Sequence, residues 1–117
     1  MIFSPVTYLK ATFPNVNFHP KISECDDAWS PYTRETRNDV IRRVHNFFDW
    51  LSYQPHNCIA VVSHGVWIEC ALMEFCPEIL DGGKKRVYNC DVYGGTLSTG
   101  ETGAVMLDVK QISLYNA

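Results

Sequence analysis

The apolar run at residues 58–63, which leads directly into His64 and Gly65, constrains the fold of this chain more than any other feature. A run of Ile, Ala and Val without polar interruption is typical of a strand that is buried on both faces, as in a parallel sheet. A helical pattern of apolar residues begins at Val66 and ends before Pro77. The sequence therefore predicts a buried strand, a short turn at His64 and a following helix.

A second helix is predicted immediately before this strand. Thr36 followed by Asp39 is typical of a capped helix start, and Pro55 marks the end of the pattern. The apolar residues between these points recur at spacings of one, three and four and form one stripe, which consists of Val40, Ile41, Val44, Phe47, Phe48 and Leu51. The order helix, strand, helix indicates an α/β fold.

The ends of the chain contribute smaller elements. Ser4 and Pro5 predict the start of a short helix that extends to about Ala11, and an irregular loop follows over residues 13–32. Strands are predicted at residues 86–93 and 102–110, with turn residues between them. At 117 residues, we expect a single domain whose mostly parallel sheet is flanked by helices and carries a C-terminal antiparallel hairpin at its edge.

Composition excludes several classes of protein. The formal net charge of −3 gives no general attraction for nucleic acid or acidic membranes, and no apolar run approaches the roughly 18 residues of a membrane span. The cysteines are odd in number and form no C-x-x-C pair, so we expect buried free thiols, at positions 58, 70 and 90 in particular, rather than a zinc site. Free thiols are typical of a reducing compartment, so we expect the protein to be in the cytoplasm or also in the nucleus.

His64 is the strongest candidate for a functional side chain. Ligands of open α/β sheets bind just past the carboxyl ends of strands, where the first turn of the next helix presents unpaired N–H groups. These groups and the positive end of the helix dipole attract anions, so a histidine at this point suggests phosphate chemistry. The backbone N–H groups of Gly65 and Val66 are the predicted additional donors.

The segment from Glu35 to Leu72 also carries a recognisable motif. The pattern Glu-Thr-x5-Arg-x7-Trp-Leu, followed by Ile-Ala-Val-Val-Ser-His-Gly-Val, resembles the C-terminal half of the histidine phosphatase superfamily, the phosphoglycerate mutase-like proteins. Phe13-Pro14-x-Val16-x-Phe18 upstream and Tyr88-Asn89-Cys90-Asp91-Val92 downstream extend the likeness over about residues 8–110.

This resemblance implies a partial phosphoglycerate mutase-like fold. It implies metal-independent phosphomonoester hydrolysis or phosphoryl transfer through a phosphohistidine, without a cofactor. The expected ligand is a phosphorylated small molecule or phosphate. By this resemblance, His64 matches the histidine of the family's second motif. That histidine is a catalytic residue because it binds the phosphoryl group during transfer. No nucleic acid or membrane partner is implied.

The chain departs from the family pattern at the nucleophile. The family nucleophile belongs to an Arg-His-Gly motif, and no Arg-His pair occurs in this sequence. The family's Ser-Pro-x-x-Arg segment has Tyr8 in place of its arginine, and its general acid has no clear counterpart. We therefore expect a truncated domain that begins after its first strands and is impaired or inactive alone. Another copy of the chain, forming a homo-oligomer, or a partner is then expected to cover the exposed sheet.

Two other functions are compatible with the sequence. The chain could be a non-catalytic interaction or regulatory module that keeps a phosphate-binding pocket. Alternatively, Ser63 could be a hydrolase nucleophile, although the first glycine of the Gly-x-Ser-x-Gly motif is missing. Neighbouring residues of a strand also point to opposite faces, which separates Ser63 from His64.

Overall fold

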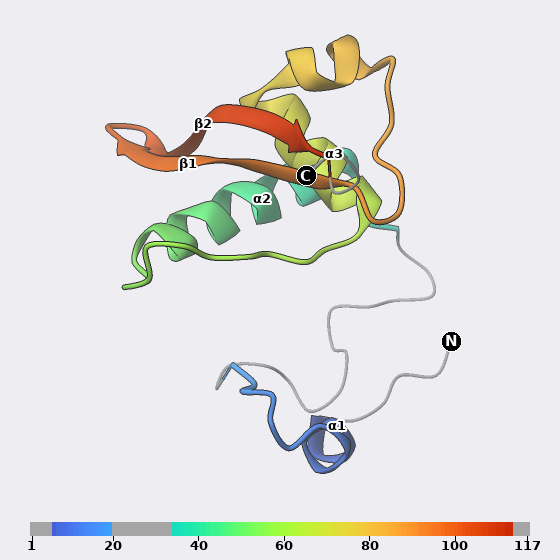
Figure 1. Cartoon of the computed structure of the whole chain (residues 1–117), viewed down its shortest axis with the longest axis vertical. Helices are drawn as coiled ribbons and strands as arrows, with labels where there is room; N and C mark the ends of the chain where they lie inside the picture. The colour runs from blue at the N-terminus through green and yellow to red at the C-terminus, as the bar shows by residue number, and fades with distance from the viewer. Residues whose placement is uncertain (1–5, 20–33, 114–117) are drawn as a thin grey trace. The chain divides into compact units, whose positions relative to one another are not determined.

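A computed structural model describes residues 6–19 and 34–113 of the chain (Figure 1). Its contacts divide the chain into two compact units, Met1–Arg34 and Glu35–Ala117. The first unit contains helix α1 (Val6–Thr12), in which Val6 is buried. The short N-terminal helix predicted from the sequence is confirmed. Its proposed cap at Ser4 and Pro5, and residues 20–32 of the predicted loop, lie outside the described residues.

Helix α2 (Arg37–Ser52) begins at the predicted cap. The backbone N–H of Asp39 donates to Thr36 Oγ1 at 3.1 Å, and the backbone N–H of Thr36 donates to Asp39 Oδ2 at 2.9 Å. This reciprocal pair is a capping box, which satisfies two backbone donors that the helix cannot pair internally. The buried positions of the helix are Val40, Val44, Phe48 and Leu51, all from the predicted stripe.

Helix α3 (Gly65–Phe75) follows, as predicted, and packs against α2 through aromatic rings. The ring of Trp67 stacks on Phe48 with centroids 5.8 Å apart, and Phe75 meets Phe48 edge to face at 5.0 Å. A short 3-10 segment, η1 (Pro77–Gly83), comes next. Inside this segment Asp81 and Gly82 have positive φ values of 51° and 66°, which interrupt the helix.

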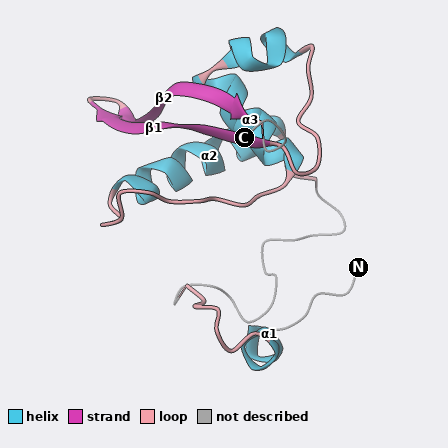
Figure 2. Ribbon diagram, viewed as in Figure 1, coloured by secondary structure: helices cyan, strands magenta, loops and turns pink. Residues whose placement is uncertain are grey.

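The C-terminal strands β1 (Val92–Gly100) and β2 (Gly103–Ile112) form the predicted antiparallel hairpin (Figure 2). Ala104 of β2 is buried in the core with the apolar face of α2. The strand predicted at residues 86–93 was placed too early, because residues 86–91 form a loop and β1 begins only at Val92. Close to that boundary, Cys90 has a positive φ of 68°, which is incompatible with a continuous strand.

The predicted parallel sheet is not present in the described part of the chain, where the two-stranded hairpin is the only sheet. Residues 58–63 are not a strand, and their apolar side chains are not buried: Val62 is 97% exposed and Val61 44%. A strand requires a neighbour that pairs with its N–H and C=O groups. No described group forms a hydrogen bond with the backbone of residues 58–63. The prediction of a strand buried on both faces is therefore wrong for this structure.

The burial predicted for the cysteines is also wrong in part. Cys70 and Cys76 are buried free thiols, whereas Cys58 and Cys90, which we expected to be buried, are exposed. Both exposed residues belong to segments that were predicted as strands and are loops here. Cys25 lies outside the described residues.

Candidate anion site at the start of helix α3

The start of α3 has the local geometry of an anion site. His64 is the N-cap residue, with an extended backbone at φ −80° and ψ 154°, and its side chain makes no capping hydrogen bond. Within the described residues, the N–H groups of Gly65, Val66 and Trp67 have no acceptor. The positive end of the helix dipole and these unpaired donors lie together at the first turn of α3.

The three predicted site residues all lie at the surface. His64 and Gly65 are exposed, and the Val66 side chain is 66% exposed. A Cβ at Gly65 would lie 3.7 Å from the carbonyl oxygen of Val87, which is an ordinary contact distance, so this carbonyl borders the first turn. Because these residues are exposed, an anion can approach the backbone donors from solvent.

Aromatic packing fixes the position of this helix start. Trp67, in the first turn of α3, meets Phe47 edge to face with ring centroids 5.4 Å apart and also stacks on Phe48. Both phenylalanines belong to α2. The orientation of the donors at the start of α3 therefore depends on the same core contacts that join the two helices.

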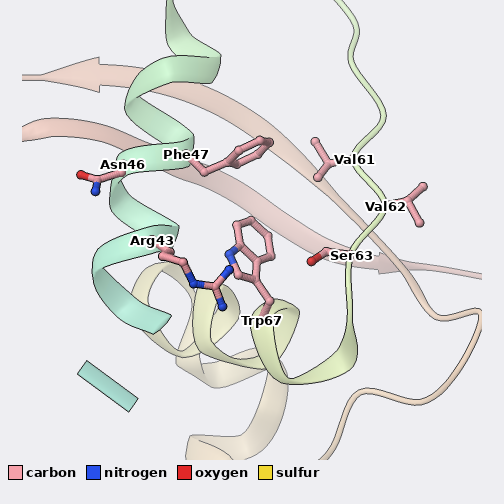
Figure 3. Close-up of a pocket in the computed structure, with 7 residues that line it drawn as sticks. All are labelled: Arg43, Asn46, Phe47, Val61, Val62, Ser63 and Trp67. Atoms are coloured by element: carbon pink, nitrogen blue, oxygen red, sulfur yellow. The ribbon is translucent and has the colours of Figure 1, made fainter. Parts of the chain in front are cut away.

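A hollow of about 370 Å³ lies beside the first turn, between α2 and residues 61–63 (Figure 3). Its lining combines aromatic and aliphatic side chains with a few polar groups: Arg43, Asn46, Phe47, Val61, Val62, Ser63 and Trp67. His64 is not among these residues, so the hollow adjoins the predicted site without including its imidazole. Ser63 and Trp67 line the hollow and are the sequence neighbours of the predicted site residues 64–66.

Arg43 and Asn46 are polar lining residues that the sequence did not predict, and Arg43 is the charged one. Its guanidinium forms a bidentate ion pair with Glu35, at 2.6 Å from Nε to Oε2 and 2.8 Å from Nη2 to Oε1. The glutamate is the first residue of the family-like motif, which gives that position a structural role here. The available signal was spacing, because Arg43 and Phe47 are one helical turn apart and therefore share a face of α2.

Two titratable groups near η1 and β1 are shifted by burial. Burial raises the pKa of the Tyr93 phenol, and the Asp91 carboxylate, whose Oδ2 accepts from the phenol at 3.3 Å, raises it further. Burial also raises the pKa of the Cys76 thiol. Both groups therefore stay protonated at neutral pH.

The described residues contain no group of three or more His, Cys, Asp or Glu side chains arranged to hold a metal ion. Nor does any helix in the described part of the chain have the length and apolar character needed to cross a membrane.

Comparisons with known proteins agree with the motif at the helix start. The histidine phosphatase superfamily (branch 1) matches residues 12–109, which is most of the chain. The chain therefore belongs to this superfamily. It is 29% identical over 121 aligned residues to Phosphoglycerate mutase-like protein 2 from Arabidopsis thaliana, with 84% of this chain and 35% of that protein covered.

A second relative is similar at the same level. The chain is 31% identical over 91 residues to Phosphoglycerate mutase-like protein from Arabidopsis thaliana, covering 74% of this chain and 34% of the relative. The chain thus spans about a third of the length of the curated relatives it matches. No solved structure matches it.

Proposed function

We propose that the start of α3 binds the phosphoryl group of a phosphorylated small molecule, with His64 as the catalytic and phosphate-binding side chain. Gly65 and Val66 contribute backbone N–H donors. The reaction class is metal-independent phosphomonoester hydrolysis or phosphoryl transfer, without a cofactor. The chain alone is impaired in this chemistry, because its sequence contains no Arg-His pair to supply the family nucleophile.

One observation carries this proposal, the open first turn of α3 next to an exposed histidine. Unpaired N–H groups at a helix start bind phosphate oxygens, and an imidazole beside them adds a donor or a positive charge. Charge that develops on the phosphoryl oxygens during transfer is stabilised by such preorganised groups. Membership of the histidine phosphatase superfamily supports this chemistry at a histidine that follows an apolar segment.

The second candidate function is a non-catalytic interaction or regulatory module that retains the phosphate pocket. The missing Arg-His pair favours it, since binding requires only the anion site whereas turnover requires a nucleophile as well. In either case we propose a phosphorylated ligand, no nucleic acid or membrane partner, and location in the cytoplasm or also the nucleus.

Titration with inorganic phosphate tests the proposed site. We expect His64→Ala to weaken phosphate binding about tenfold or more, because it removes a charge-assisted hydrogen bond. His45→Ala is the matched control, since His45 lies on α2 and contacts Glu74 at 3.1 Å rather than the start of α3. Equal affinities for wild type and His64→Ala would remove the imidazole from the site.

Turnover of para-nitrophenyl phosphate separates the two functions. Hydrolysis that is lost in His64→Ala supports an enzyme, whereas phosphate binding without hydrolysis supports the module. Both outcomes are interpretable only with a folded variant, so the far-ultraviolet circular dichroism of each protein is compared first.

A further inference from the structure

Glu69 holds a loop beside the candidate anion site. It lies on α3, one turn after the site, and its Oε1 accepts a hydrogen bond from the backbone N–H of Val87 at 2.9 Å. Its Oε2 accepts from Arg86 Nη1 at 3.4 Å. The Glu69 side chain is 20% exposed and that of Arg86 73%, so the carboxylate is the shielded partner. Both of its oxygens are therefore directed at consecutive residues of one loop.

The loop at residues 84–91 is also fixed on each side of this contact. The backbone N–H of Lys85 donates to the Leu80 carbonyl at 2.9 Å. Beyond the contact, a tight turn is closed by the Tyr88 N–H, which donates to Asp91 Oδ2 at 2.8 Å, and by the Asp91 N–H, which donates to the Tyr88 carbonyl at 3.1 Å. The Glu69 carboxylate is the side chain that connects the middle of this loop to α3.

The same contact places the loop next to the open helix turn. Val87, whose N–H is held by Glu69, has its carbonyl oxygen 3.7 Å from the position that a Cβ of Gly65 would occupy. One peptide segment is thus tied to the second turn of α3 and lies against the first. The consecutive cations Lys84, Lys85 and Arg86 belong to this loop.

We propose that Glu69 is a positioning residue for the anion site. By holding the Val87 peptide, it keeps residues 84–88 as a wall of the site at His64, Gly65 and Val66. The inference rests on the proposed function, because it assigns a support to the same phosphate-binding turn. It assigns Glu69 no contact with phosphate.

Electrostatic repulsion alone predicts the opposite change in phosphate affinity when Glu69 is removed. A carboxylate one turn from a helix N-terminus repels a bound anion, so its removal alone should tighten phosphate binding. If Glu69 acts by positioning, removing it releases the wall and weakens binding in spite of that gain. The sign of the change in phosphate affinity therefore distinguishes the two effects.

The experiment is a titration of the full chain with inorganic phosphate, followed by the backbone amide signals of Gly65, Val66 and Val87 in nuclear magnetic resonance spectra. We expect Glu69→Ala to weaken phosphate binding about fivefold to tenfold and to accelerate hydrogen exchange at Val87. Glu69→Gln retains an acceptor for the Val87 N–H, so its affinity should stay within about twofold of wild type or increase. Glu74→Ala, on the same helix, is the control that leaves the loop contact intact.

Each outcome decides the proposal. Unchanged or tighter phosphate binding by Glu69→Ala overturns it while leaving the His64 site in place. A loss of about fivefold to tenfold in Glu69→Gln relative to wild type also overturns it, whether or not Glu69→Ala folds, because the charge rather than the hydrogen bond to Val87 would then matter. Absence of phosphate binding by the wild-type chain refutes the proposed function as well, and so is distinguishable from failure of the positioning role alone.

Discussion

At the scale of single residues, Asp49 shows how one side chain joins two elements. Its Oδ1 accepts a hydrogen bond from the backbone N–H of Ala104 at 3.0 Å, which connects α2 to the start of β2. We expect Asp49→Ala to lower the free energy of unfolding by about 1–2 kcal/mol, since a partly buried backbone donor loses its acceptor. Urea unfolding measures the change.

Asp49→Asn is the control for this prediction, because its amide oxygen can still accept from Ala104. It should recover most of the stability that Asp49→Ala loses. The neighbouring Gly103 must stay unchanged in these variants, since it has a φ of 120° and a Cβ there would be 3.1 Å from Asp49 Oδ1. Equal stability of wild type and Asp49→Ala would show that the hydrogen bond is replaced by water without loss.

The sequence predicted individual residues well where the reason was local. His64 was placed at the start of a helix by the residues on either side of it, and it is the N-cap of α3. Cys58 and Cys90 were misplaced because burial depends on which segments pack nearby, a property that their own neighbours in sequence do not determine. The contact between Glu69 and Val87 was unpredictable for the same reason.

At the scale of elements, the capping box makes α2 sensitive to acid. The pKa of the Asp39 carboxyl lies below its ordinary value of 3.8, mainly because it accepts the Thr36 backbone N–H, with further contributions from the Thr36 side chain and Arg42. A carboxyl whose pKa is lower in the folded chain stabilises the fold above its unfolded pKa. That stabilisation is lost as the pH falls through the folded value.

Near neutral pH Asp39 stays ionised, so we expect its contribution to the stability of α2 to be constant there. The stability should fall below about pH 3.8, as the carboxylate becomes protonated. Circular dichroism during an acid titration measures the loss of helix. Glu78 also has a lowered pKa, so the comparison must be made with Asp39→Asn, in which only the Asp39 contribution is removed. If that variant shows the same acid transition as wild type, the capping box does not contribute to it.

Helix ends were predictable because their signals are short. Thr36 with Asp39 predicted the start of α2, and Pro77 the end of α3, from residues less than one turn away from each boundary. The hairpin followed from the turn residues between β1 and β2. The proposed strand at residues 58–63 differs from these elements because a strand is completed only by a partner that is distant in sequence.

At the scale of the whole molecule, this unpaired segment predicts self-association. Residues 57–63 carry no charge, and the exposed side chains of Ile59, Val61 and Val62 favour an extended backbone. An uncharged, apolar edge without hydrogen-bond partners pairs readily with another copy of itself, and no like charges oppose that pairing. We therefore expect the chain to form a homo-oligomer through residues 57–63 at micromolar concentrations.

Sedimentation velocity tests this prediction with Val62→Lys. The substituted side chain is 97% exposed, so the change should leave the fold intact while placing a charge on the pairing edge, and the chain should shift toward monomer. Tyr53→Lys is the matched control, because it removes another apolar side chain, 86% exposed, and adds the same charge outside the segment. A monomeric wild-type chain, or an equal shift in both variants, would contradict pairing through residues 57–63.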